Sequence, residues 1–272
     1  MSKIEIIPLY SGSSGNSTLL KFGASKILVD LGKSTKQTLI ALEQVGVAPE
    51  EIDAILVTHG HSDHICGIDV FIRKYNIPIY CSEGTLGVIL RSCKKPHSND
   101  LDNIVKAFSS FEINSPKERN PIRVTPLKTS HDSPGSQCYM FEFDGSKVAI
   151  ATDLGYMSED IRANLLGSDI IMLESNFDIE MLHSGPYPFD LKRRIEGRFG
   201  HLSNYDCACE LENFIKNGTR RFILAHLSAE NNVPELAYNS AVAYLSRTGF
   251  CIGKDYDLIV AKRHEPTEGY SI

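Results

Sequence analysis

The chain has 272 residues, a length that suits one large layered α/β domain or two smaller ones. Apolar residues make up 42% and charged residues 23%, which excludes whole-chain disorder, a collagen helix and a coiled coil. The 28 basic and 34 acidic side chains give a net charge of −6, which argues against bulk electrostatic capture of nucleic acid without forbidding a local basic groove.

Strands and helices alternate through the first half of the chain. Apolar, β-rich runs predict strands over residues 3–9, 18–22, 26–30, 52–58 and 77–81. Helical periodicity predicts helices over residues 36–45, 65–75 and 83–94. The polar stretch 96–120 has no clear period, so we expect irregular structure there, with room for short strands.

The second half repeats this alternation. Strands are predicted over residues 122–129, 137–143, 147–152, 170–174, 221–225 and 256–261. Helices are predicted over residues 159–166, 188–199, 204–217 and 234–248. No linker or break in composition divides the chain, so we expect one layered α/β domain over residues 1–272.

The chain lacks the marks of secretion and of membrane insertion. Its N-terminus has no apolar segment of the kind a secretory signal needs, and no run approaches the ~18 apolar residues that span a bilayer. The 7 cysteines are an odd number scattered through the chain, which is not a disulfide framework. We therefore expect a cytoplasmic protein with no membrane partner.

The most unusual segment is HGHSDH at residues 59–64, which follows an apolar strand. Three imidazoles and a carboxylate so close together are a poor choice for a core, because each buried polar group needs a partner. A divalent metal supplies that partner, and nitrogen with carboxylate oxygen suits Zn, Mn, Fe or Co. The alternative is a solvated loop that happens to be rich in histidine, and we consider it improbable.

This HxHxDH pattern resembles the signature of the metallo-β-lactamase fold, and four further motifs of that family follow the expected order. They are Asp30 at the end of ILVD, His131 in KTSHD, Asp153 at the end of VAIATD, and His226 at the end of FILAH. The resemblance implies an α/β fold, a four-layer αβ/βα sandwich of two mixed sheets with outer helices. It also implies two divalent metal ions, Zn or Mn, with Fe as a third option.

The resemblance carries over a ligand set onto matching positions. The first metal would be bound by His59, His61 and His131, and the second by Asp63, His64 and His226. Asp153 would bridge the two ions, and Asp30 would hold the loop rather than ligate. An isolated histidine is ordinarily a structural group, but His131 and His226 each come after an apolar strand in family order, so we favour ligation.

Finer motifs are similar to the YycJ/WalJ-type branch of this superfamily. They are SGSSGNS at 11–17, ATDLG at 151–155, LESNFD at 173–178, GHLSN at 200–204 and LSAENN at 227–232. That branch resembles the nuclease and phosphodiesterase members, which implies a 5′-to-3′ exonuclease acting on DNA. A β-CASP insertion is not expected, because the chain has no spare block of domain size.

The expected chemistry uses a metal-bridging hydroxide as the nucleophile on phosphorus. Asp63 or Asp153 would orient it, and His201 would touch the phosphate or protonate the leaving oxygen, unless it only caps a helix entry. Six residues, Asp30, Ser14, Asn16, Ser17, Glu174 and Asn176, are expected to support the metals or bind substrate. Ser14, Asn16 and Ser17 could equally form a plain turn. Glu174 and Asn176 could equally belong to a hydrogen-bond network that fixes a loop.

A single or end-exposed nucleic-acid strand is the expected substrate. The basic segment 192–198 leads into His201, and Tyr187, Phe189 and Phe199 nearby would either stack on bases or belong to the core. Other basic pairs, including Lys94-Lys95, are interpreted as solvated faces. Two alternatives stay open, namely a small-molecule hydrolase of a cyclic nucleotide, lactone or thioester, and a non-catalytic metal-binding regulator. Oligomeric state is not predicted.

Overall fold

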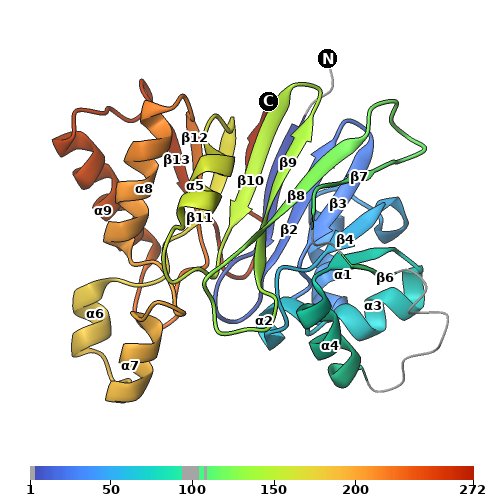
Figure 1. The fold of residues 1–272 in the computed structure, drawn as a ribbon, viewed down its shortest axis with the longest axis horizontal. Helices are drawn as coiled ribbons and strands as arrows, with labels where there is room; N and C mark the ends of the chain where they lie inside the picture. The colour runs from blue at the N-terminus through green and yellow to red at the C-terminus, as the bar shows by residue number, and fades with distance from the viewer. Residues whose placement is uncertain (1–3, 94–103, 107–108) are drawn as a thin grey trace.

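The computed structural model describes residues 4–93, 104–106 and 109–272 of the chain (Figure 1). Its strands form two sheets of seven. The first sheet runs in the order β14 (Tyr270–Ser271), β1 (Ile4–Tyr10), β2 (Ser17–Phe22), β3 (Ser25–Val29), β4 (Ala54–Leu56), β5 (Ile79–Cys81), β6 (Ile104–Lys106). The second runs in the order β13 (Asp257–Val260), β12 (Arg221–Ala225), β11 (Ile170–Glu174), β10 (Ser146–Ala151), β9 (Gln137–Phe143), β8 (Ile122–Lys128), β7 (Phe111–Ile113).

Both sheets are mixed, as expected. In the first sheet β14, β1, β2 and β3 pair antiparallel, and β3 to β6 pair parallel. In the second sheet β7 to β10 pair antiparallel, and β10 to β13 pair parallel. Parallel neighbours end at the same edge of their sheet, so each sheet gathers the residues that follow its parallel strands into one place.

Helices cover the outer face of each sheet, which completes the predicted four layers (Figure 1). Those on the side of the first sheet are α1 (Thr35–Gln44), α3 (Ile68–Tyr75) and α4 (Glu83–Ser92). Those on the side of the second sheet are α5 (Glu159–Leu165), α8 (Asn204–Lys216) and α9 (Pro234–Arg247). The remaining helices are the 3₁₀ turn η1 (Pro49–Glu51), α2 (Ser62–Ile65), α6 (Ile179–Ser184) and α7 (Phe189–Ile195).

The inner strands β3, β4, β11 and β12 are buried on both faces, which explains their nearly continuous apolar sequences. Successive residues of β3 divide between two cores, because Ile27 packs between the sheets while Leu28 packs against the helices beside the first sheet. Phe22 and Phe141 meet in the central core from opposite sheets, with ring centres 5.7 Å apart. The central core thus joins the two halves of the chain, and a single domain without a β-CASP insertion remains our prediction.

The single helix predicted over residues 65–75 is wrong. The chain instead forms α2 over Ser62–Ile65 and then α3 from Ile68. At the break, Gly67 donates its backbone N–H to the carbonyl of Leu31, and a Cβ at this position would collide with the carbonyl oxygen of Lys33. This close approach ties the segment after the HGHSDH motif to the loop after β3.

Other boundaries also differ from the prediction. The strand predicted over 52–58 forms ladder pairs only over β4, because the backbone N–H of Thr58 donates to Asp30 rather than to a neighbouring strand. The helix predicted over 188–199 ends at Ile195, since His201 N donates to the Ile195 carbonyl through a turn. Helix α6 and strand β14 were not predicted, and β6 and β7 lie within the stretch expected to be irregular. Residues Lys94 and Lys95 lie outside the described part of the chain.

None of the helices within residues 4–93, 104–106 and 109–272 combines the length and the apolar character needed to cross a membrane.

Candidate metal centre

Five strand ends deliver the polar side chains of the site. Asp30 follows β3, His59 follows β4 after two residues, Asp153 follows β10, Glu174 ends β11, and His226 follows β12 directly. Three of these residues have left-handed backbone conformations, with φ values of 64° at Asp30, 61° at Asp153 and 55° at His226. This conformation costs an L residue about 1–2 kcal/mol, and such strain clusters at functional sites.

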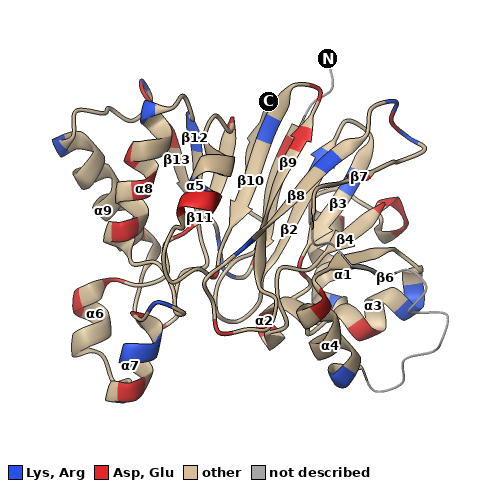
Figure 2. Cartoon of the chain, in the orientation of Figure 1, with Lys and Arg blue, Asp and Glu red and all other residues tan. Residues whose placement is uncertain are grey.

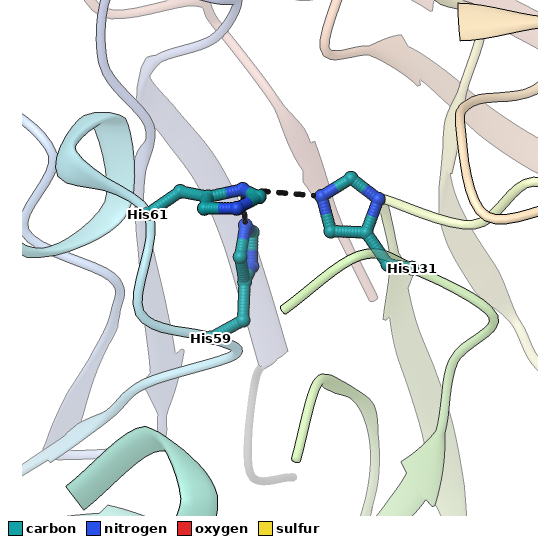
Figure 3. A group of neighbouring side chains, drawn as sticks. All are labelled: His59, His61 and His131. Atoms are coloured by element: carbon teal, nitrogen blue, oxygen red, sulfur yellow. Dashed lines mark hydrogen bonds between the residues drawn. The ribbon is translucent and has the colours of Figure 1, made fainter. Parts of the chain in front are cut away.

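Three histidines converge on one point with their acceptor nitrogens (Figure 3). Nδ1 of His61 lies 3.1 Å from Nε2 of His59 and 3.2 Å from Nε2 of His131. Nδ1 of His131 donates to the carbonyl of Gly200 at 3.1 Å, which leaves its Nε2 without a proton when the ring is neutral. Protons cannot satisfy all three facing nitrogens at once, whereas one metal ion satisfies them together.

A second group lies beside the first. The Nε2 atoms of His64 and His226 each lie 3.6 Å from Oδ2 of Asp63. Asp153 lies between the two groups, because its carboxylate is 3.4 Å from His64 and His226, 3.7 Å from His131 and 4.0 Å from His59. The ligand set carried over from sequence is therefore brought together in full, with the predicted bridging residue at its centre.

Two buried atoms at this centre have no hydrogen-bond partner among the described residues. They are Oδ2 of Asp153 and Nε2 of His226, and both face the second group of side chains. Leaving a buried polar atom without a partner costs about 1–3 kcal/mol. Ligation by a divalent cation would satisfy both atoms, so the side chains present fit the metal that the fold implies.

Carboxylates behind the histidines fix which ring nitrogen faces the centre. Nδ1 of His64 donates to Asp30 at 2.7 Å, and Asp30 also accepts from the backbone and the hydroxyl of Thr58 at 2.8 Å each. Nδ1 of His226 donates to Glu174 at 2.9 Å. Such carboxylate–histidine pairs orient metal-binding imidazoles and raise their basicity. Asp30 and Glu174 thus lie where a supporting role was expected.

The other supporting residues separate into two groups. The Asn16 amide nitrogen lies 3.0 Å from Nε2 of His64, and the Asn176 amide donates to the His226 carbonyl at 2.7 Å. Ser14 is exposed and accepts from Lys33, while the buried hydroxyl of Ser17 has no partner among the described residues. The structure therefore places the two asparagines at the site, and it gives neither serine a contact with the ligand set.

The site opens into a cavity of 250 Å³. Its lining includes four residues that the sequence did not single out, Ser13, Leu191, Ile195 and Ser228. It also includes Tyr187 and Arg194, which the sequence suggested only as candidate contacts of a nucleic-acid strand. Arg194 on α7 donates to Asp132 at 2.5 Å, and Asp132 Oδ1 lies 3.5 Å from His131 and 3.6 Å from His61. In the sequence, only its position next to His131 pointed to a role for Asp132, because its partner Arg194 is 62 residues away.

In the metal-free protein, the surroundings raise the pKa of two histidines of the cluster and lower the pKa of another. Burial disfavours a charge on His64, but the carboxylates of Asp153, Asp30 and Asp63 outweigh it and raise its pKa to about 9. Against the same burial, Asp153 and Asp63 raise the pKa of His226 well above 6.5. Burial and the neighbouring imidazoles lower the pKa of His59 well below 6.5.

This distribution predicts that metal binding releases protons, because a ligating imidazole must be neutral. From neutral pH up to about 9, where His64 titrates, the apparent metal affinity should rise about tenfold per pH unit for each proton released. Calorimetry in buffers of different ionisation enthalpy measures that release directly. Binding at neutral pH without proton release would contradict the assignment.

The stability of the metal-free protein should change with pH in the opposite direction to the metal affinity. A histidine whose folded pKa is raised stabilises the fold below its ordinary pKa of 6.5, and this stabilisation is lost as the pH rises through about 9. The free energy of unfolding in the presence of chelator should therefore fall over this range. Denaturant titrations at several pH values, with and without metal, would show whether the two trends diverge.

Comparison with known proteins agrees with this geometry. A family described as beta-lactamase superfamily domain matches residues 25–227. The exodeoxyribonuclease WalJ of Streptococcus pneumoniae serotype 2 is 38% identical over 248 residues, covering 91% of this chain and 90% of that protein. The exodeoxyribonuclease YycJ of Bacillus anthracis is 34% identical over 265 residues, covering 96% of each.

Solved structures support the fold. The metallo-β-lactamase fold protein YhfI of Bacillus subtilis superposes with a TM-score of 0.71 at 17% identity, covering 99% of this chain and 100% of that one. Unliganded yeast PDE1 gives the same TM-score at 14% identity, covering 98% and 99%. The chain therefore belongs to the metallo-β-lactamase superfamily, and it is a metal-dependent hydrolase whose candidate metal site is the histidine and aspartate cluster described above.

Proposed function

We propose that the protein is a dinuclear metal-dependent exonuclease that hydrolyses single-stranded or end-exposed DNA in the 5′-to-3′ direction in the cytoplasm. The proposal is supported by two relatives named exodeoxyribonucleases that match over at least 90% of their length. The observation that carries it is the pair of ligand groups with Asp153 within 4.0 Å of histidines from both.

The charges of the cluster favour two ions rather than one. Four carboxylates meet here, from Asp30, Asp63, Asp153 and Glu174. When His64 and His226 are neutral, as ligation requires, these two rings no longer offset the four negative charges. Two divalent cations neutralise them, whereas one leaves two negative charges buried. Nitrogen and carboxylate ligands suit Zn or Mn, and Fe is a third option.

Each ligand has a role in this proposal. His59, His61 and His131 would hold the first ion, and Asp63, His64 and His226 would hold the second, with Asp153 between the two groups as a ligand available to both. When bound, two such cations activate a water molecule near neutral pH and neutralise charge on the phosphate oxygens. Asp63 lines the cavity, and its carboxylate would accept a hydrogen bond from the attacking water and so orient it toward the phosphorus.

His201 is the proposed general acid. Its Nδ1 donates to Glu174 at 2.7 Å, which leaves Nε2 as the nitrogen available to the cavity that the ring lines. When both ring nitrogens carry a proton, Nε2 would give its proton to the leaving oxygen as the P–O bond breaks, and the neutral ring would keep its Nδ1–H on Glu174. Arg194 lines the same cavity and is held in place by Asp132, so its guanidinium is positioned to bind a substrate phosphate.

A small-molecule phosphodiesterase is the second candidate function. The cavity of 250 Å³ is slightly below the range of about 300–1,000 Å³ that is usual for ligand pockets. It therefore fits one phosphate and its neighbours, which a cyclic nucleotide would provide as well as a strand end. Lactone and thioester substrates have no specific support in these residues.

End-labelled single-stranded DNA and RNA separate these functions when they are assayed with wild type and with His61→Ala. We expect metal-dependent release of mononucleotides from the 5′ end of DNA by wild type, and a loss of that activity in His61→Ala. Bis-p-nitrophenyl phosphate should be hydrolysed, and nitrocefin and a thioester should not. Turnover of a cyclic nucleotide without degradation of any strand would favour the second candidate. If the protein hydrolysed neither a strand nor a cyclic nucleotide, both functions would be contradicted.

A further inference from the structure

Large aromatic side chains are exposed beside the cavity. The exposed fractions are 72% for Phe189, 60% for Phe199 and 37% for Tyr156. Phe189 begins α7, and Phe199 follows that helix in the turn leading to His201. Both were open to interpretation as core residues from sequence, and their exposure rules this out. Aromatic side chains as exposed as these offer free faces on which a nucleic-acid base can stack.

Arginine side chains lie over these rings. The guanidinium of Arg193 is 5.8 Å from the centre of the Phe189 ring, and that of Arg198 is 4.9 Å from the centre of the Tyr156 ring. Arg198 also donates to the Tyr156 hydroxyl at 3.2 Å, and this hydrogen bond lowers the pKa of Tyr156. These contacts hold each pair in an ordered arrangement in which both the ring and the positive charge remain at the surface.

The segment is positively charged within an acidic protein. Residues 187–201 contain four basic side chains, at 192, 193, 194 and 198, against acidic ones at 190 and 196, so the local charge is +2 where the whole chain has −6 (Figure 2). Lys192 and Arg194 are already engaged by backbone carbonyls and by Asp132. Arg193 and Arg198 therefore add positive charge at the outer surface to that of Arg194, which lines the cavity.

Hydrogen bonds connect this surface directly to the metal centre. The Ser130 hydroxyl, next to His131, donates to the carbonyl of Arg198 at 2.5 Å. His201 N donates to the carbonyl of Ile195 at 2.9 Å, and Leu191 and Ile195 line the cavity itself. Arg198 and Phe199 thus lie in a turn that adjoins the cavity. Phe189 and Arg193, each two positions from Leu191, lie on the other face of α7, so a strand that leaves the cavity would cross this helix to reach them.

We propose that Tyr156, Phe189, Phe199, Arg193 and Arg198 form a stacking platform for a single nucleic-acid strand whose end enters the cavity. This inference rests on the proposed function. Aromatic faces bind any base but need an unpaired one, and arginines between them bind the connecting phosphates. A base-paired duplex offers no free base faces, so the platform would select single strands without selecting sequence.

Substitutions of the two most exposed rings test this proposal. We expect Phe189→Ala/Phe199→Ala to raise KM for an oligothymidine of about ten nucleotides roughly tenfold or more, because each stacked base contributes measurably to binding. The kcat for bis-p-nitrophenyl phosphate should stay at the wild-type value, because neither ring belongs to the metal centre. Phe189→Trp/Phe199→Trp should keep the low KM, which a loss of fold would not predict.

A matched substrate and a matched variant complete the test. An oligomer with the same phosphates but abasic sugars should bind wild type and the double alanine variant equally weakly. Tyr205→Ala removes an aromatic side chain that is 58% exposed on α8, and it should leave both substrates unaffected. A double alanine variant with unchanged KM for oligothymidine would overturn the platform and leave the nuclease proposal standing. No strand cleavage by wild type would instead reject the proposed function.

Discussion

Asp153→Asn should lower the rate of phosphodiester hydrolysis about a thousandfold, which corresponds to about 4 kcal/mol of transition-state stabilisation. The carboxylate lies 3.4 Å from His64 and His226, 3.7 Å from His131 and 4.0 Å from His59, so it is close to both halves of the ligand set. An amide has the same shape but no charge, and it offers a single oxygen to two ions. Both metal content and rate should fall.

The substitution should leave the fold intact, which makes the result interpretable. Position 153 has a φ of 61°, and asparagine is among the few residues that adopt this conformation readily. Asp144→Asn is the matched control, because Asp144 also has a positive φ, 49°, but lies exposed in the turn between β9 and β10. Metal analysis and initial rates on bis-p-nitrophenyl phosphate are the measurements. An Asp153→Asn enzyme with full metal content and near wild-type rate would rule out the bridging role.

The family resemblance could predict the ligand set because each ligand has a local signal. His59, His61, Asp63 and His64 lie within six residues, and the more distant ligands each follow an apolar strand that can be recognised alone. Residues that follow parallel strands of one sheet meet at the same edge of that sheet. Asp153 follows β10 and His226 follows β12 in the same sheet, which brings the two side chains together. The left-handed turns at these positions carry no such signal, since an aspartate or histidine after a strand adopts several conformations.

Features that depend on contacts between distant segments escaped prediction. The pairing of Arg194 with Asp132 joins α7 to the loop after β8, and neither residue is unusual in its own neighbourhood. The split between α2 and α3 results from the approach of Gly67 to residues 31–33, which helical periodicity does not register. Sequence also left Phe189 equally compatible with core and surface, because a short amphipathic helix does not reveal which face another segment will cover.

Glu174 is the clearest case of a role that only the structure makes specific. Sequence reasoning left it between supporting a metal and closing a loop, and its contacts do both. Oε1 accepts from Nδ1 of His201 at 2.7 Å and of His226 at 2.9 Å, while Oε2 accepts from the backbone of Leu154 at 3.0 Å and of Leu202 at 3.3 Å. The residue is fully buried, and although burial opposes its charge, the two histidines hold its pKa below the ordinary value.

Glu174→Gln should weaken metal binding about 10- to 100-fold, the usual effect of losing the partner behind a ligand. The amide keeps only one oxygen for four donors, so either orientation turns its NH₂ group toward other donors and leaves buried hydrogen bonds unmade. Glutamine at this position would no longer fix the ring orientation of both His226 and His201, so the rate of hydrolysis should fall even at saturating metal. Titration against a competing chelator gives the affinity, and rates at saturating metal give the second effect.

Glu210→Gln separates this role from general stability. Glu210 is also buried and accepts two hydrogen bonds from Arg162, at 2.7 and 2.9 Å, but it lies on α8 outside the ligand set. Both variants should lower the melting temperature, because each leaves buried donors without a full partner. Only Glu174→Gln should lower metal affinity, and adding metal should recover less stability in it than in Glu210→Gln. Equal metal affinities in the two variants would reduce Glu174 to a loop-closing residue.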